Sequence, residues 1–171
     1  NLGWAYFKKN EFDPALENYD KALELDPDDH ITRRNRILAL YHSGRLKIAL
    51  KECDGLILDY PDYHNAYHAR GLIRNDLGDQ RGACEDYSKA IELKPDFVGG
   101  YINRGNIRNK SGDTNGAIED YSKAIEIEPR SGYAYLNRGW LYYNTGEIDK
   151  ALADYKKAIE AGFVHYMLWQ N

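Results

Sequence analysis

Charged side chains that could pair with one another recur at a fixed interval of 34 residues. A guanidinium group suits a partly buried, bidentate pair with a carboxylate, so one basic and one acidic set predict a ladder of ion pairs within or between repeats. The alternative is an arginine stripe that grips an anionic ligand. In the first 34-residue unit, Leu2 and Asn18 replace both charges together. The basic set contains Arg36, Arg70, Arg104 and Arg138, and the acidic set contains Glu52, Asp86, Asp120 and Asp154.

Other motifs that could bind a metal ion or a phosphate give weaker signals. His64 and His68 are spaced to share one helix face and could pair on a metal ion, but nothing nearby supplies a clear third ligand. We therefore interpret them as solvated or groove-lining histidines. The segment Gly100–Gly105 has the glycine spacing of a phosphate loop, but Asn106 and Ile107 follow where lysine and a hydroxyl residue are required. No catalytic constellation stands out, so we expect no enzyme activity, no cofactor and no metal site.

Composition limits the class of protein. The chain has 171 residues, 43% of them hydrophobic, and a formal net charge of −4. It is expected to pack rather than to be disordered, and its bulk charge gives no reason to expect nucleic acid or a membrane as a partner. Cys53 and Cys84 fall on apolar faces of expected helices, so we interpret them as free thiols. The compartment is left open, with the cytoplasm slightly favoured.

A 34-residue repeat organises the chain. The stretch ACEDYSKAIELKP at Ala83–Pro95 returns almost unchanged at Ala117–Pro129 and more loosely three further times. Proline closes a helix because it lacks the amide donor, and a Gly or Asn column marks a tight turn. Between these marks, apolar residues three and four apart predict helices, with Asp13 as an N-cap. We expect them at Asn1–Lys9, Asp13–Leu25, Ile31–His42, Lys47–Leu58, Asn65–Leu77, Arg81–Leu93, Gly99–Lys110, Asn115–Ile127, Tyr133–Thr145 and Asp149–Glu160.

Small and aromatic residues occupy fixed columns of the repeat. Small side chains let two helix axes approach closely, and the aromatic column supplies the bulk beside them. The second repeat departs from both columns, with Ile37 and Cys53 in place of glycine and tyrosine. We expect slightly wider helix spacing and lower local stability there. The glycines are Gly3, Gly71, Gly105 and Gly139, and the tyrosines are Tyr19, Tyr87, Tyr121 and Tyr155.

These columns and their period resemble the tetratricopeptide repeat. The resemblance implies an all-α fold, a right-handed superhelical solenoid of five helix-turn-helix repeats in a single array, truncated at both ends. Arg74 and Arg108 depart from the family pattern because they stand in the aromatic column of the first helix. An unsealed end would expose Leu168 and Trp169 to another copy of the chain. The expected repeats are residues 1–29, 30–63, 64–97, 98–131 and 132–165, followed by the start of a sixth helix pair at 166–171.

The resemblance also implies a concave groove lined by the first helix of each repeat. The candidate residues vary between repeats where the packing residues do not, and they are aromatic toward both ends and amide-rich in the middle. Aromatic and arginine residues are common interface anchors. The alternative is that Trp4 and Trp140 merely cover the interior. The candidates are Trp4, Phe7, Arg34, Leu38, Tyr41, His68, Leu72, Asn75, Ile102, Asn106, Asn109, Leu136, Trp140 and Tyr143.

The sequence therefore predicts a non-enzymatic scaffold that binds a peptide segment of a partner protein. Such a peptide would use apolar anchors and hydrogen bonds from Asn75, Asn106 and Asn109. The alternatives are a structural segment that self-associates through exposed end helices, and a regulatory array attached to an enzyme outside these residues. Some family members clamp the acidic tail of heat-shock chaperones. Because Ile102 and Met167 stand where that clamp needs polar or charged residues, we expect no such clamp here.

Overall fold

The computed structural model describes residues 2–163, and these residues form ten α-helices and no strand. Every predicted helix is present, with each end within one residue of its expected position. The sixth helix pair expected at 166–171, including Leu168 and Trp169, lies outside the described residues. The helices are α1 (Leu2–Lys8), α2 (Phe12–Leu25), α3 (His30–His42), α4 (Leu46–Asp59), α5 (His64–Asp76), α6 (Gln80–Leu93), α7 (Val98–Lys110), α8 (Thr114–Ile127), α9 (Gly132–Asn144) and α10 (Ile148–Glu160).

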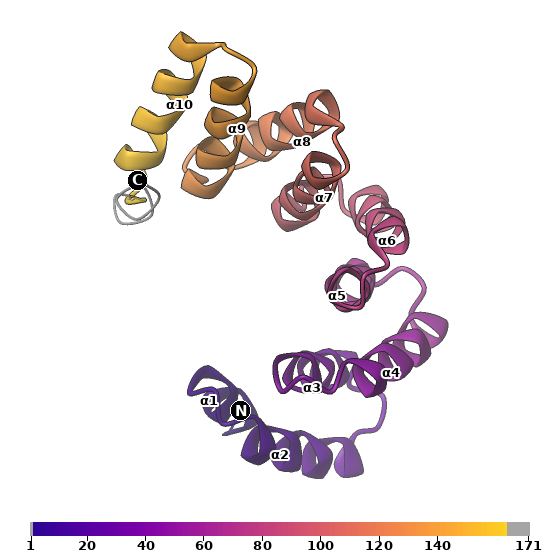
Figure 1. Ribbon diagram of the computed structural model, residues 1–171. Helices are drawn as coiled ribbons and strands as arrows, with labels where there is room; N and C mark the ends of the chain where they lie inside the picture. The colour runs from indigo at the N-terminus through magenta and orange to yellow at the C-terminus, as the bar shows by residue number, and fades with distance from the viewer. Residues whose placement is uncertain (1, 164–171) are drawn as a thin grey trace. The chain divides into compact units, whose positions relative to one another are not determined.

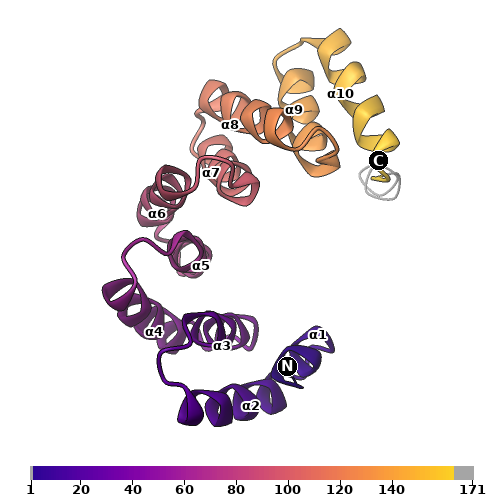
Figure 2. The ribbon, with the colours of Figure 1, turned by 180° about the vertical axis from the view of Figure 1, so that it is seen from behind.

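The helices form pairs, and the chain divides into two compact units. Unit 1 is Asn1–Lys94 and unit 2 is Pro95–Asn171. Within each unit, every helix packs against the next one in the chain, and in unit 1 α3 also contacts α5. In both ribbon views α1, α3 and α5 lie on one side of unit 1, and α2, α4 and α6 lie on the other (Figures 1 and 2). We call the side formed by α1, α3 and α5 the first-helix face of unit 1, and the side formed by α7 and α9 the first-helix face of unit 2.

The turns within the pairs follow the predicted Gly or Asn column. Asn10 has a φ of 61°, and the glycines of the same column have φ values between 78° and 89°. Only residues that tolerate the left-handed region end a helix in this way. The expectation for Asp13 is wrong: α2 begins at Phe12 with Glu11 as its N-cap, so Asp13 lies in the first turn. Pro14 is tolerated beside it because the first turn has amides without intrahelical partners.

Glycine and tyrosine columns interlock in the core. A Cβ atom on Gly71 would lie 2.5 Å from the Tyr87 ring, and one on Gly105 would lie 2.9 Å from the Tyr121 ring. The tyrosine ring therefore occupies the space that the glycine leaves, and any side chain larger than hydrogen would displace it. Tyr87 and Tyr121 are nearly completely buried. No helix within residues 2–163 is long and apolar enough to span a bilayer.

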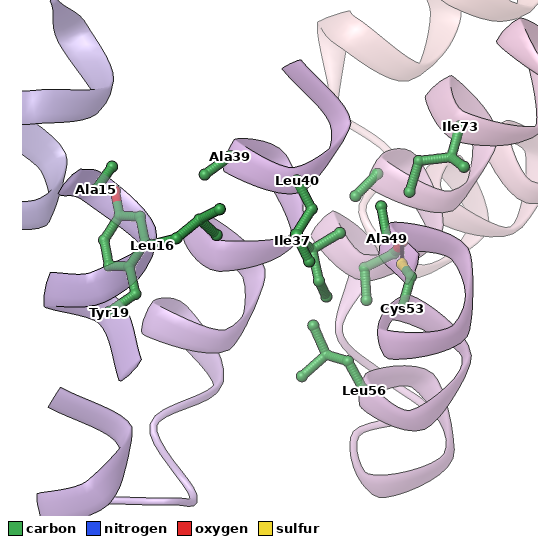
Figure 3. Close-up of a cluster of buried hydrophobic side chains, with 12 residues drawn as sticks. Ala15, Leu16, Tyr19, Ile37, Ala39, Leu40, Ala49, Cys53, Leu56 and Ile73 are labelled. Atoms are coloured by element: carbon green, nitrogen blue, oxygen red, sulfur yellow. Dashed lines mark hydrogen bonds between the residues drawn. The ribbon is translucent and has the colours of Figure 1, made fainter. Parts of the chain in front are cut away.

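In the second repeat, the glycine position carries a large side chain and the tyrosine position carries a small one. Ile37 and Cys53 are 1% and 0% exposed, so the larger side chain now comes from the first helix and the smaller one from the second. The Cys53 thiol donates to the Ala66 carbonyl at 3.1 Å, and burial raises the pKa of this thiol to about 12. Cys53 and Cys84 are free, as predicted. Figure 3 shows Ile37 and Cys53 among the buried side chains that continue from α2 to α5.

Candidate functional site

The predicted ladder of ion pairs is confirmed. Arg70 Nη2 lies 2.7 Å from Asp86 Oδ1, and Arg104 Nη2 lies 2.6 Å from Asp120 Oδ1. The equivalent pairs are Arg138 with Asp154 and Arg36 with Glu52. Each joins the first helix of a repeat to its second helix. The aspartates are buried, so the arginines are engaged in ion pairs inside the repeats. The alternative of an arginine stripe that binds an anionic ligand is therefore not supported.

The ladder also joins successive repeats, which was one of the two predicted arrangements, although the acceptors involved were not predicted. Arg70 Nη1 donates to Asp54 of the preceding repeat at 2.9 Å, and Arg138 Nη1 donates to Ser122 Oγ at 2.9 Å. Arg36 reaches Asp20 in the same way. The sequence contained a signal for these contacts, because the acceptors Asp20, Asp54 and Ser122 stand at one position of the 34-residue repeat.

A second arginine on the buried aspartates was missed as well. Arg74 Nη1 lies 2.9 Å from Asp86 Oδ2, and Arg108 Nη1 lies 3.0 Å from Asp120 Oδ2. Each of these carboxylates therefore receives two guanidinium groups. Arg74 and Arg108 stand where the family pattern has an aromatic residue, and each places a second positive charge beside a buried aspartate.

A cleft beside the ladder in unit 1 is lined mostly by charged side chains. Its volume is about 510 Å³, and its lining includes Arg33, Arg36, Glu52 and Gly55. Arg33 Nη2 lies 2.8 Å from Asp59 Oδ2, and Arg36 is held by Glu52. Both arginines of the lining are therefore already engaged in ion pairs.

The aromatic candidates of α1 form a cluster. Trp4 stacks on Phe7 with ring centroids 5.1 Å apart, and Lys8 Nζ lies 4.7 Å from the centroid of the Trp4 ring. Phe7 also meets the edges of Phe12 and His42. Trp4 is 37% exposed, so this cluster offers part of an indole surface at the start of unit 1.

Arg34 and His68 lie on α3 and α5 of the first-helix face of unit 1. Arg34 Nη1 donates to Asn35 Oδ1 at 3.2 Å. The Nε of Arg34 and the hydroxyl of Tyr19 are both buried and have no hydrogen-bond partner among the described residues. Burial and the nearby Arg34 charge lower the pKa of His68 to about 4, so its imidazole is neutral near pH 7. His64 and His68 belong to no metal-binding cluster within residues 2–163.

The remaining candidates of unit 1 are half-buried. Leu38 and Tyr41 pack against the core of the unit, and Leu72 is similarly half-buried on α5. The Tyr41 hydroxyl donates to Asp76 Oδ2 at 2.7 Å, and Asn75 Nδ2 donates to Asp76 Oδ1 at 3.0 Å. Burial and the contact with Asp76 raise the pKa of Tyr41 to about 12. The two candidates therefore meet at one exposed carboxylate.

In unit 2, an amide candidate accepts the buried tyrosine. Asn106 Oδ1 accepts from the Tyr121 hydroxyl at 2.7 Å and from Asn137 Nδ2 at 3.3 Å. This carbonyl thus satisfies a donor from α8 and a donor from α9. Asn109 and Ile102 lie half-buried on α7.

The candidates on α9 divide by exposure. Trp140 and Tyr143 are 45% and 60% exposed. Leu136 is only 7% exposed, which corrects the expectation that it lies open on the groove. Leu136 belongs to the buried side of α9, together with Gly132, Ala134, Gly139 and Leu141.

Models of the tetratricopeptide repeat match most of the chain. One such model matches residues 1–29 and 132–161, and a second TPR repeat model matches residues 71–112 and 105–146. RNA polymerase II-associated protein 3 of Xenopus laevis is 36% identical over 88 residues, which are 52% of this chain and 13% of that protein. The heat-shock cognate co-chaperone sgt12 of Aspergillus fumigatus is 33% identical over 90 residues, 53% of this chain and 26% of that protein. The chain therefore aligns with only a small part of these relatives.

Solved structures share the fold over nearly the full length. A crystal structure of MamA has a TM-score of 0.79 and 25% identity, and the match covers 98% of both chains. A thermophilic TPR protein of Thermus thermophilus, TTC0263, has a TM-score of 0.79 and 21% identity over 98% of this chain and 91% of that one. YrrB, described as a TPR protein with an unusual peptide-binding site, has a TM-score of 0.70 and 22% identity over 97% and 86%.

Proposed function

Because the chain belongs to the tetratricopeptide repeat family, an all-α family of repeat solenoids, we propose that it is a non-enzymatic scaffold that binds a peptide segment of a partner protein. The peptide would lie on a first-helix face. Two relatives are named as a heat-shock cognate co-chaperone and an Hsp70-Hsp90 organizing protein, and YrrB is described as having an unusual peptide-binding site.

The exposed aromatic pair on α9 carries this proposal. Trp140 and Tyr143 are 45% and 60% exposed, although large aromatic side chains usually bury most of their surface. Neither residue belongs to the ion-pair ladder or to the glycine–tyrosine interlock. Aromatic rings exposed beside amide side chains give a peptide both an apolar anchor and hydrogen-bond partners.

A peptide selection with matched variants tests the proposal. Random dodecapeptides displayed on phage would be selected against the wild-type chain and against a Trp140→Ala, Tyr143→Ala variant. We expect peptides to be enriched by the wild-type chain and their affinity to fall at least tenfold on the variant. The control is Leu25→Ala, Leu58→Ala, which removes apolar side chains that are more exposed, at 90% and 82%, from second helices. Equal loss in both variants would contradict a peptide site on α9.

A second candidate function, self-association, is favoured by an apolar stripe on α10. Leu152 is 62% exposed, whereas Leu16, at the same position of the first repeat, is 6% exposed. Ile148 and Ile159 on the same helix are 47% and 46% exposed. A second copy of the chain could cover this stripe. Light scattering across a concentration series would show a dimer that Leu152→Lys abolishes, and a monomer at all concentrations would exclude this function.

A further inference from the structure

We propose that the cleft between α2 and α4 in unit 1 is a second interaction site, which takes a lysine or arginine side chain of a partner protein. This cleft, of about 510 Å³, is called the α2–α4 cleft below, and α3 contributes to its lining as well. In the chain α3 packs against both α2 and α4 (Figure 1). The cleft shares no residue with the exposed aromatic pair of α9, so the site goes beyond the proposed function.

Repeat two differs from its neighbours at two positions of this cleft. Arg33 stands where repeat three has Tyr67, and Gly55 stands where repeat three has Lys89. In repeat three the Tyr67 ring covers the ladder arginine, with its centroid 5.6 Å from Arg70 Cζ. The same tyrosine and lysine positions hold Tyr135 and Lys157 in repeat five, where the Tyr135 ring lies 5.8 Å from Arg138 Cζ.

Gly55 leaves open space inside a helix. A Cβ atom on Gly55 would have one neighbour within 4 Å, Arg33 Nη2 at 4.0 Å, which is an ordinary van der Waals contact. The position therefore has room for a side chain, although repeat two supplies none. The other four repeats each hold a lysine here: Lys21, Lys89, Lys123 and Lys157.

Arg33 does not supply the missing cation, because carboxylate and aromatic partners outside the cleft hold it. Arg33 Nη2 lies 2.8 Å from Asp59 Oδ2, and Arg33 Cζ lies 5.8 Å from the centroid of the Tyr60 ring. Neither partner belongs to the lining of the cleft. The charge of Arg33 is thus balanced by a carboxylate that the cleft does not count among its own.

The carboxylates of the cleft exceed its remaining cation. Arg36 binds both Asp20, at 2.6 Å, and Glu52, so one guanidinium group serves two carboxylates. The Asp20 side chain is 51% exposed and has room for a further donor. Glu24 is exposed and has no ion pair within residues 2–163.

The same helix positions form an ion pair in other repeats. Lys89 Nζ lies 2.7 Å from Glu92 Oε1, and Lys123 Nζ lies 2.8 Å from Glu126 Oε1. Lys21 and Glu24 have this spacing on α2 but are not paired in the structure. The Glu24 carboxylate is therefore available to a cation from outside the chain.

The lining selects an organic cation with an apolar stem. Ile37, which is 1% exposed, and the half-buried Leu23 give the cleft apolar surface beside its carboxylates. Lysine and arginine side chains place an apolar stem on such surface and a charged group at its edge, where carboxylates accept charge-assisted hydrogen bonds. A metal ion fits less well, since no three His, Cys, Asp or Glu side chains within residues 2–163 are placed to hold one.

The test fills the cleft with the lysine that the other repeats carry. Random dodecapeptides displayed on phage are enriched on the wild-type chain, and the pool is then divided between wild type, Gly55→Lys and the control Ile48→Lys. The control adds the same charge to α4 two turns earlier, at a side chain that is 52% exposed and outside the cleft. We expect one set of peptides that Gly55→Lys loses and Ile48→Lys retains, and these peptides should share a lysine or arginine position.

Affinities of one such peptide complete the test. By fluorescence anisotropy, Gly55→Lys and replacement of the shared basic residue of the peptide by glutamine should each weaken binding about tenfold or more. Glu24→Gln should weaken it several-fold, whereas Glu17→Gln, at an exposed glutamate of the same helix outside the cleft, should not. Glu24→Gln should add little once the peptide has lost its basic residue. Thermal denaturation of Gly55→Lys verifies that the variant folds, and Glu24→Gln tests the site without filling the cleft.

Three results would overturn the site. The first is that Gly55→Lys retains every peptide of the wild-type pool, and the second is that the peptides it loses share an acidic position or no charged position. The third is equal weakening by Ile48→Lys and Gly55→Lys, which would show general attraction to an acidic surface. Peptides that bind Gly55→Lys but not the Trp140→Ala, Tyr143→Ala variant would leave the proposed function standing in each case.

Discussion

Unit 1 and unit 2 hold a buried tyrosine at the same position of the repeat, but its hydroxyl meets different surroundings. In unit 2, Tyr121 donates to Asn106. In unit 1, Tyr19 meets no acceptor among the described residues, and Arg34 brings a positive charge instead of the apolar residue found in unit 2. The comparison teaches that a repeat can keep its packing while changing the polarity of its exposed face.

The largest predicted effect separates a buried ladder carboxylate from a partly exposed one. Asp120→Ala would leave Arg104 and Arg108 without their buried partner and should lower the free energy of unfolding by about 3–5 kcal/mol. Glu52→Ala should cost about 1 kcal/mol or less, because the Glu52 side chain is 30% exposed and solvent screens its charge. Urea denaturation of the two variants measures the difference, and equal losses would show that burial does not set the strength of the ladder.

The second prediction concerns the exchanged pair in repeat two. Cys53→Tyr places a ring where Ile37 already fills the space, and it should destabilise the chain by about 1–3 kcal/mol. Adding Ile37→Gly restores the glycine–tyrosine pattern of the other repeats and should recover most of that loss. Thermal denaturation of the single and double variants tests this coupling. If the losses simply add, the two positions do not share one space.

The third prediction uses the titration of His68, for which unit 2 has Ile102 at the same position. The folded-state pKa of about 4 lies below the unfolded value of ~6.5, so the unfolded chain binds more protons between these values. Stability should therefore fall as the pH decreases from about 6.5 to about 4, by at most roughly 3 kcal/mol. Denaturation of the wild-type chain and His68→Leu at a series of pH values measures it. Parallel curves for both chains would mean that carboxylates alone cause the loss.

The smallest predicted effect concerns the hydroxyl groups of the two buried tyrosines, Tyr19 and Tyr121. Tyr121→Phe removes a satisfied hydrogen bond and should cost about 1 kcal/mol. Tyr19→Phe removes a buried hydroxyl that has no partner among the described residues, and it should be neutral or stabilise by up to about 1 kcal/mol. Chemical denaturation of the free chain measures the sign of the change in the free energy of unfolding for each variant. A loss of similar size in both variants would show that Tyr19 has a partner in solution.

Much of the fold could be predicted from the sequence because the packing residues repeat. Prolines, turn glycines and the glycine–tyrosine columns report backbone geometry, and each occurs several times, so one ambiguous copy is corrected by the others. The Arg–carboxylate ladder was predictable for the same reason. The N-cap of α2 was not, because Asp13 has the side chain that N-caps prefer, whereas the helix begins after Glu11, which makes no side-chain cap hydrogen bond.

The candidate site was less predictable, since its residues vary between repeats. Leu136 and Trp140 lie on the same helix and look equally apolar in the sequence, yet one is buried and the other is 45% exposed. The acceptor role of Asn106 depends on a tyrosine from the next helix and an asparagine from the next repeat. Such contacts are set by side-chain direction across helices, which column spacing does not report.

The exchanged sizes of Ile37 and Cys53 also constrain how this chain could arise or be rebuilt from its modules. A recombination event between these two positions would join glycine to cysteine, leaving a void, or isoleucine to tyrosine, producing a clash. The two halves of repeat two must therefore be inherited together. Deletions or duplications with breakpoints in the loops between repeats keep the pair intact, and engineered shuffling should respect the same boundaries.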